Sequence, residues 1–230
     1  MAGDRLLRIL AELGAEGKGW SAARLCAVCP QIVGVTGAGV MLMSGDVPRG
    51  SLCATNEVSQ LIEELQFTLG EGPCMDAYHN DRPVGEPNLA APNVPRWLAF
   101  SPPAVEAGVR AVFGFPVRIG AVRIGALNLY RDQPGALDDE QHADALVMAA
   151  VVARAVLAMQ SEAPPGALAG ALEAGLNLRF VVHQASGMVA VQLGVGLGEA
   201  LVRLRGYAFA HDRLLTDVAH EVVSRRLSLA

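Results

Sequence analysis

Residues 161–166, with the sequence SEAPPG, divide the chain into two folding units. The paired prolines, Pro164 and Pro165, follow a long apolar stretch with helical periodicity. Proline lacks an amide hydrogen and its ring collides with the preceding turn, so the helix must end before the pair. The parts on either side are long enough for one medium and one small domain. We therefore predict a linker at 161–166 between a larger unit and a tail at 167–230.

The larger unit alternates predicted strands and helices. Strands are predicted at residues 36–44, 50–54, 109–119 and 122–130, with a short strand at Pro83-Val84. Helices are predicted at residues 1–19, 21–32, 57–67 and 138–159, with Ser21 as the N-cap of the second helix. The proline-rich segment 87–103 is expected to be mostly loop. Two hairpins flanked by helices indicate an α+β domain at residues 20–160, built on an antiparallel sheet, after a separate N-terminal helix at 1–19.

The tail carries three stripes of apolar residues at helical spacing. They begin at Leu178, Leu197 and Leu215, and Thr216 is the predicted N-cap of the third helix. Helices of this length are unstable alone, but three of them can bury a shared core. We therefore predict an all-α three-helix module at residues 167–230.

Four segments of the larger unit resemble a GAF domain of the bacterial signalling type. These are TGAGVMLMS, GEGPCMDA, VRAVFGFPVRIG and IGALNLY, followed by the long exit helix. The resemblance covers about residues 20–160. It implies a GAF-type antiparallel sheet flanked by helices, and a sensor for a small ligand. The family binds many kinds of ligand, so the fold does not name one.

The tail resembles the ANTAR domain, a three-helix module that binds nascent transcripts and prevents termination. The resemblance lies in RFVVHQASG, Gly194-Val195, Glu199-Ala200, the LRxYA segment from Leu204 and Asp217-Val218-Ala219. It implies RNA contacts from one set of tail residues: Arg179, His183, Gln184, Ser186, Arg203, Arg205, His211 and Arg213. The whole chain thus resembles a bacterial transcription antitermination regulator, with hairpins of nascent RNA as its partner and DNA not expected as one.

Three positions of the tail lack the basic residue that the ANTAR family usually has there. They are Ser186, Phe209 and Leu214. Fewer phosphate contacts release fewer counterions, so we expect weak RNA affinity with a shallow salt dependence, and tighter binding for Ser186→Lys. The net charge of the chain is −5, and the tail is far from the basic footprint usual for RNA binders. The alternative is that the tail is a dimerisation or protein-interaction module.

The expected ligand pocket lies where the sheet meets the turn Gly70-Glu-Gly-Pro73. Its predicted members are Met41, Met43, Cys74, Asp76, Phe113, Phe115 and Leu127. The larger unit contains only two histidines, His79 and His142, and neither is placed as an axial haem ligand. We therefore expect a small-molecule ligand of unknown identity and no cofactor.

The four cysteines are interpreted as reduced core residues. Cys26 and Cys29 form a CxxC pair on a predicted helix, but no second pair follows to complete a zinc site, so no metal is predicted. Cys74 follows the GEGP turn, where a helix N-terminus would lower its pKa. This permits one enzymatic alternative, a free methionine sulfoxide reductase of the GAF type that uses Cys74, with Cys53 nearby. We favour a structural Cys74 and a protein that is not an enzyme.

The sequence predicts a cytoplasmic homodimer. Its start shows no apolar signal segment, and the apolar run at residues 145–159 contains Arg154 and is shorter than the roughly 20 residues of a membrane span. We therefore expect no membrane partner. The same helix carries more apolar surface than one sheet face covers, notably Leu146, Val147, Ala150 and Leu157. A symmetric dimer would bury this surplus together with the N-terminal helix.

Overall fold

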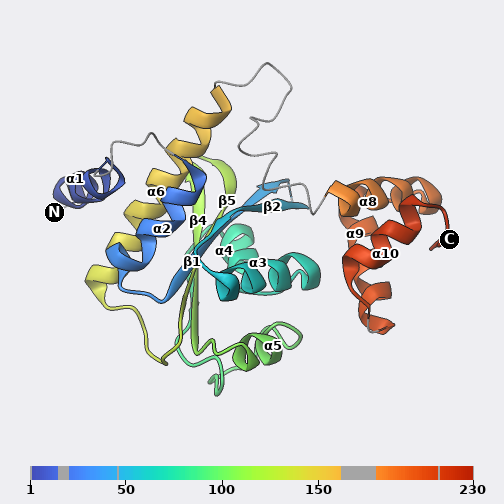
Figure 1. Cartoon of the computed structure of the whole chain (residues 1–230), viewed down its shortest axis with the longest axis horizontal. Coiled ribbons are helices and arrows are strands. Elements are labelled where there is room, and N and C mark those ends of the chain that lie inside the picture. The colour runs from blue at the N-terminus through green and yellow to red at the C-terminus, as the bar shows by residue number, and fades with distance from the viewer. Residues whose placement is uncertain (1, 15–20, 46, 162–179, 212, 230) are drawn as a thin grey trace.

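The computed structural model describes residues 2–14, 21–45, 47–161, 180–211 and 213–229 (Figure 1). Its larger unit contains α1 (Ala2–Gly14), α2 (Ala22–Val33), β1 (Gly37–Ser44), β2 (Val47–Ala54), α3 (Glu57–Leu69), α4 (Pro73–Asn80), β3 (Val84–Glu86), α5 (Ser101–Glu106), β4 (Ala111–Ile119), β5 (Val122–Arg131) and α6 (Asp139–Ser161). Its tail contains α8 (Phe180–Leu193), α9 (Leu197–Ala210) and α10 (Leu215–Val223). Apart from Ser161, the predicted linker lies outside the described residues.

Five antiparallel strands form one sheet in the order β2-β1-β5-β4-β3. This confirms the predicted α+β unit and both of its hairpins. The register pairs Val40 with Leu127, and Gly114 with Asn128. Because directly paired residues point to the same side of a sheet, this register decides which side chains can meet.

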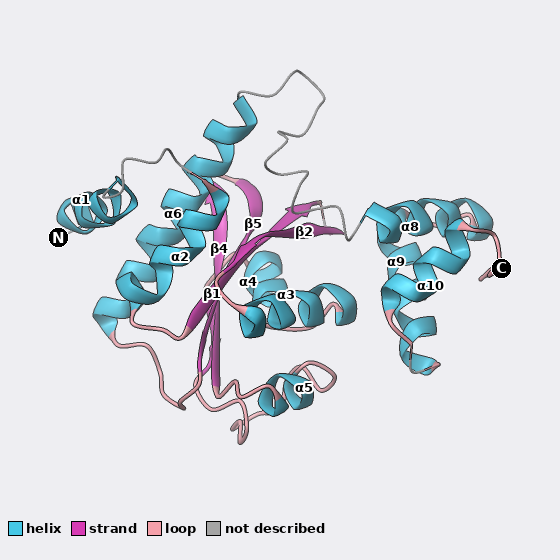
Figure 2. Ribbon diagram, viewed as in Figure 1, coloured by secondary structure: helices cyan, strands magenta, loops and turns pink. Residues whose placement is uncertain are grey.

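Helices cover both faces of the sheet (Figure 2). One face, here called the α6 face, lies under α2 and α6, with α1 packed on the outer side of these helices, and contains the largest apolar core. The other, the α3 face, lies under α3 and α4, with α5 at its lower end (Figure 1). The α3 face is less uniformly apolar, because several of its buried side chains are polar. That difference makes it the face to search for a site.

The long helix α6 is the central helix of the larger core. By length and composition alone, α6 could cross a membrane. Helices α8 and α9 together would also be long and apolar enough, but only as one span bent by 104°. Within α6, however, Ala145, Met148 and Val152 are fully buried in the core of the α6 face. The apolar character of α6 is therefore that of a core helix.

The N-terminal helix α1 covers part of the apolar surface of α6. Ile9 is fully buried there, and two arginines clamp one carboxylate: Arg5 Nε donates to Asp144 Oδ1 at 2.8 Å and Arg8 Nη2 to Asp144 Oδ2 at 2.5 Å. Part of the surplus expected to drive dimerisation is thus covered within the chain. Leu146 and Leu157 remain exposed.

Local sequence signals place some of the helix ends. The Ser21 side chain accepts a hydrogen bond from the amide of Arg24 and caps α2, as predicted. Asp138 Oδ1 accepts from the amide of Gln141 at 2.8 Å and caps α6. The prediction for Thr216 is wrong: the N-cap of α10 is Leu214, and Thr216 lies inside the first turn. Helix α5 begins within the last three residues of the segment 87–103, predicted to be mostly loop, and its six residues are too few to show a period.

The three tail helices share an apolar core, as predicted. Its fully buried members include Val182, Ala185, Val189, Leu204 and Val218. The same cluster extends into Met41, Met43, Phe67, Met75 and Tyr78 of the larger unit. The tail is therefore docked on the α3 side of the sheet, next to the C-terminal end of α3 (Figure 1).

A disulfide joins Cys26 of α2 to Cys53 of β2, so the expectation of four reduced cysteines is wrong for this pair. Helix α2 lies across β2 and brings the two Cα atoms to 6.0 Å, a spacing suited to a disulfide. The sequence separation of 27 residues hid this contact from sequence reasoning. Cys29 and Cys74 are free and buried, as core cysteines should be.

Reducing this disulfide is expected to lower the free energy of unfolding by about 3 kcal/mol, because the bond closes a loop of nearly thirty residues in the unfolded chain. Urea unfolding with and without a thiol reductant measures the difference. Cys53→Ala is the matched control, and its unfolding midpoint should not respond to reductant. Equal midpoints for the oxidised and reduced wild type would contradict the prediction.

Candidate functional site

The residues predicted for the ligand pocket do not come together, and this prediction is wrong as a set. Phe113, Phe115 and Leu127 lie in the core of the α6 face. Met41 and Met43 lie on the α3 face, as do Cys74 and Asp76 of α4. The register explains the split, because Leu127 pairs with Val40 rather than with Met41. Sequence alternation showed the period of each strand but not how neighbouring strands align.

A buried polar cluster on the α3 face takes the place of the predicted pocket. Its side chains, Glu63 and Gln66 of α3 and Asn128 of β5, are at most 2% exposed. Asn128 Nδ2 donates to Glu63 Oε1 at 3.3 Å, and Gln66 Oε1 accepts from the amide of Cys74 at 2.7 Å. Gln66 Nε2 and Asn128 Oδ1 have no hydrogen-bond partner among the described residues. Unsatisfied buried polar atoms cost about 1–3 kcal/mol each, so a polar group bound beside them, a water molecule or a ligand, would stabilise the cluster.

The cluster was not predicted from the sequence, although two of its residues show a recognisable pattern. Glu63 and Gln66 are one helical turn apart, on the side of α3 that also carries the fully buried Ile62. Polar residues on a buried face of a helix are rare and point to a site. Gly39 of β1 leaves space for the Glu63 side chain, because a Cβ on that glycine would lie 2.6 Å from Glu63 Oε1.

The tail meets the larger unit through two of its predicted RNA-binding residues. Arg205 Nη2 donates to the carbonyl oxygen of Phe67, the residue that follows Gln66 in α3. The ring of His183 packs edge-on against Phe67 with centroids 6.1 Å apart, and His183 Nε2 lies 3.1 Å from the carbonyl oxygen of Arg49. His183 and Arg205 therefore face the larger unit in this arrangement instead of an open RNA surface.

A third predicted RNA contact, Ser186, is also wrong as a surface residue. Ser186 is 2% exposed, and its Oγ donates to the carbonyl oxygen of Val182 at 2.8 Å. It therefore belongs to the tail core. Because serine is small and polar, the sequence did not show that this position lies on the buried side of α8.

The other predicted contacts lie toward solvent or outside the described residues. Gln184 is exposed, and Arg203 Nη2 pairs with Glu199 Oε1 at 3.1 Å. Arg213 pairs with Glu221 at 2.9 Å, which raises the pKa of Arg213 and lowers that of Glu221. His211 stacks on Tyr207 with ring centroids 4.0 Å apart. Arg179 lies outside the described residues.

Comparison with known families decides what the larger unit is. Residues 22–157 match the GAF domain family. The chain belongs to the GAF domain family. The match ends within α6 and does not include the tail. GAF domains bind small ligands, and the match names no specific one.

The chain is similar to several solved structures at low sequence identity, and the first of them below shows the same fold. The GAF domain of a phosphoenolpyruvate-protein phosphotransferase from Coxiella burnetii is 12% identical with a TM-score of 0.53, covering 69% of this chain and 96% of that one. A domain of a two-component sensor histidine kinase from Sinorhizobium meliloti is 16% identical (TM-score 0.49; 60% and 89%). Free methionine-R-sulfoxide reductase from Neisseria meningitidis is 15% identical (TM-score 0.48; 70% and 92%). No curated protein matches the chain.

Cys74 of the GAF domain is not an activated thiol. Complete burial raises its pKa well above the usual value, nearby Glu63 raises it further, and the hydrogen bond with Gln66 only partly opposes them. The expectation that the N-terminus of α4 would lower this pKa is therefore wrong, because burial outweighs the helix dipole. Cys53 of β2 lies opposite Val40 of β1 in the sheet, and its side chain points to the α6 face, on the other side of the sheet from Cys74.

The polar groups beside the cluster anchor a loop of the GAF domain. Asp76 Oδ2 accepts a hydrogen bond from Trp97 Nε1 at 2.9 Å. Glu71 Oε2 accepts from the amides of Ala99 and Phe100 at 2.9 and 3.3 Å. Asp76, predicted as a pocket residue, thus holds the segment that leads into α5. Among the described residues, no group of three or more His, Cys, Asp or Glu side chains could hold a metal ion.

Proposed function

We propose that the protein is a signal-responsive regulator whose GAF domain binds a small polar molecule and whose tail binds RNA and opposes transcription termination. One observation carries the proposal: consecutive residues of α3 serve both parts. The Gln66 side chain belongs to the buried polar cluster, and the carbonyl oxygen of Phe67 accepts from Arg205 of the tail. A ligand that satisfies the cluster therefore acts one residue away from the docking contact.

The last turn of α3 connects the buried polar cluster to the contact with the tail. The helix ends at Leu69. Its C-cap Gly70 has a left-handed backbone (φ 70°), and the next residue, Glu71, accepts a hydrogen bond from the segment before α5. A ligand that binds Gln66 Nε2 therefore contacts a helix end that is held by Arg205 of the tail and by the segment before α5. The two states are then a docked tail, with Arg205 on Phe67, and a released tail. A ligand shifts this equilibrium only by its difference in affinity for the two states.

The proposal that the tail is an ANTAR-type RNA module rests on its three-helix form and on its remaining cationic residues. Arg203 and Arg213 are accessible beside His211 in the docked arrangement, while His183 and Arg205 become available only on release. RNA readers contact exposed loop bases and phosphates, which suits arginine and stacked rings. Docking thus covers part of the proposed RNA surface, so the affinity for RNA would depend on whether the tail is docked or released.

Two alternatives make different predictions. The tail also exposes Val202, Phe209 and Leu214, which favours a protein-interaction module, and such a module would bind no RNA in either state. A thiol reductase would need a reactive Cys74, and the raised pKa of that thiol disfavours this. We therefore propose that the protein is not an enzyme.

The proposed assembly is a homodimer in the cytoplasm. Leu7 of α1 and Leu146 and Leu157 of α6 stay exposed, on two helices that pack together. This apolar surface suits a second copy of the chain. The proposed RNA partner requires a cytoplasmic location, where the Cys26–Cys53 disulfide would be subject to reduction.

Thr68→Arg is expected to release the tail and to tighten RNA binding about tenfold. Thr68 lines the space between the two units together with Arg205, so an arginine side chain there adds a second positive charge and extra volume between them. The measurement is filter binding of an RNA with two tandem hairpins, with small-angle scattering to report release. Leu61→Arg adds the same charge to α3 at an exposed position and should bind RNA like the wild type. A released tail without RNA binding would favour the interaction-module alternative.

A further inference from the structure

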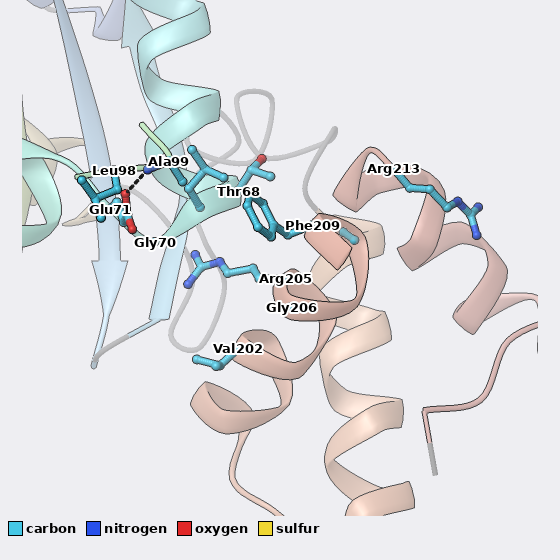
Figure 3. A pocket seen from close by; sticks show the side chains of 12 residues that line it. Thr68, Gly70, Glu71, Leu98, Ala99, Val202, Arg205, Gly206, Phe209 and Arg213 are labelled. Atoms are coloured by element: carbon cyan, nitrogen blue, oxygen red, sulfur yellow. Dashed lines mark hydrogen bonds between the residues drawn. The ribbon is translucent and has the colours of Figure 1, made fainter. Parts of the chain in front are cut away.

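A cavity of about 800 Å³ lies between the GAF domain and the tail (Figure 3). One wall comes from the end of α3 and the turn after it, Thr68 to Glu71, and from Leu98 and Ala99. The opposite wall comes from α9. This volume is typical of small-molecule sites, which measure roughly 300–1,000 Å³. The cavity is separate from the buried polar cluster, which faces the sheet.

The walls of this cavity present unusually exposed apolar side chains. Leu98 is 73% exposed, Val202 60% and Phe209 72%. They come from both units, and Figure 3 shows them around one space. Large exposed apolar side chains gathered on one concave surface mark a binding site for apolar matter.

The same cavity contains a cation without a counter-charge. Arg205 points from α9 toward Gly70 and Glu71 (Figure 3). Its Nη2 donates to the carbonyl oxygen of Phe67, whereas its buried Nε has no hydrogen-bond partner among the described residues. In the part of the chain that the structure describes, no carboxylate forms an ion pair with Arg205, and the Glu71 carboxylate, which lines the same cavity, accepts instead from the amides of Ala99 and Phe100. Burial lowers the pKa of Arg205 to about 10, as expected for a guanidinium that has lost water without gaining an anion.

We propose that this cavity binds a small amphipathic organic anion, with an acidic head on Arg205 and an apolar body against Leu98, Val202 and Phe209. An acidic oxygen would give the Arg205 guanidinium, which lines the cavity, an anionic partner through a charge-assisted hydrogen bond. The apolar body would cover side chains that now face water. Because the walls belong to both units, such a ligand contacts both and holds the tail in its docked position.

The test compares two fluorescent dyes of nearly the same shape. The probe 8-anilinonaphthalene-1-sulfonate carries an acidic group on an apolar body, and N-phenyl-1-naphthylamine has the same body without the charge. We expect the full-length protein to bind the sulfonate more tightly. Arg205→Gln should weaken the sulfonate about tenfold and leave the neutral dye within about threefold, as loss of one charge-assisted contact requires. Arg203→Gln, on the exposed side of the same helix, is the control and should change neither dye.

A second pair of variants keeps Arg205 intact, because Arg205→Gln removes a docking contact and could lower the affinity for both dyes by releasing the tail. Leu98→Glu and Leu98→Gln remove the same apolar wall at an exposed position and differ only in charge. The glutamate should bind the sulfonate several-fold more weakly than the glutamine, with equal binding of the neutral dye. Equal affinity for the sulfonate in the wild type, Arg205→Gln and Leu98→Glu would overturn the proposal. The readout involves no RNA, so failure of the proposed RNA function leaves this test unaffected.

Discussion

Gly114→Ala is expected to lower the free energy of unfolding of the GAF domain by at least about 4 kcal/mol. Gly114 lies on β4 beneath the start of α4, beside its strand partner Asn128. An added Cβ would lie 2.3 Å from the carbonyl oxygen of Pro73 and 2.5 Å from its carbonyl carbon. Both are backbone atoms, so no side-chain rotation relieves the collision. Helix α4 would have to move off the sheet, at a cost in the highest range for overpacked cores.

Urea unfolding monitored by tryptophan fluorescence tests this, because the buried Trp97 is fixed to α4 by its hydrogen bond with Asp76. Gly187→Ala is the matched control, since a Cβ on this helical glycine of α8 would meet no atom within 4 Å. The control should be neutral or more stable by about 0.5–1 kcal/mol, because alanine loses less entropy in a helix. A stable Gly114→Ala with its Asp76–Trp97 contact intact would show that α4 does not need this close approach.

The sequence predicted the elements of the fold because their signals are local. The Ser21 cap, the hairpin turns and the tail stripes each depend on a few neighbouring residues, and the structure contains the corresponding elements. The resemblance of residues 20–160 to a GAF domain led to the right family for the same reason, since its motifs are short segments in order. The assignment of the tail to the ANTAR family stays a prediction.

The candidate sites could not be predicted, because they depend on contacts between distant segments. Met41 and Leu127 both follow the strand period, but only the register places them on opposite faces. Cys26 and Cys53 meet because α2 crosses β2. Arg205 was predicted to contact RNA from the resemblance of the tail to the ANTAR domain, yet docking of the tail points it at Phe67. In each case the outcome depends on tertiary packing, which local sequence signals do not contain.

Ser186→Lys is expected to destabilise the tail by about 4 kcal/mol rather than to tighten RNA binding. Ser186 is buried in α8 beside the tail core, next to the fully buried Ala185, and its Oγ donates to the carbonyl oxygen of Val182. An ammonium at this position would lose its water without gaining a carboxylate, and an unpaired buried charge costs several kcal/mol. The expectation drawn from the family pattern, tighter RNA binding, thus reverses once burial is known.

Two controls separate burial from charge in this experiment. Ser186→Ala removes only the hydroxyl and should cost about 1 kcal/mol or less, since the Val182 carbonyl oxygen lies within a helix that offers it a backbone partner. Gln184→Lys adds the same charge at an exposed position of α8, so it should leave stability unchanged and strengthen RNA binding by adding a phosphate contact. Circular dichroism during thermal unfolding, combined with filter binding, measures both properties. If Ser186→Lys unfolds like the wild type and binds RNA more tightly, the side of α8 that carries Ser186 is open to RNA, and the docked packing of the tail core described above is wrong.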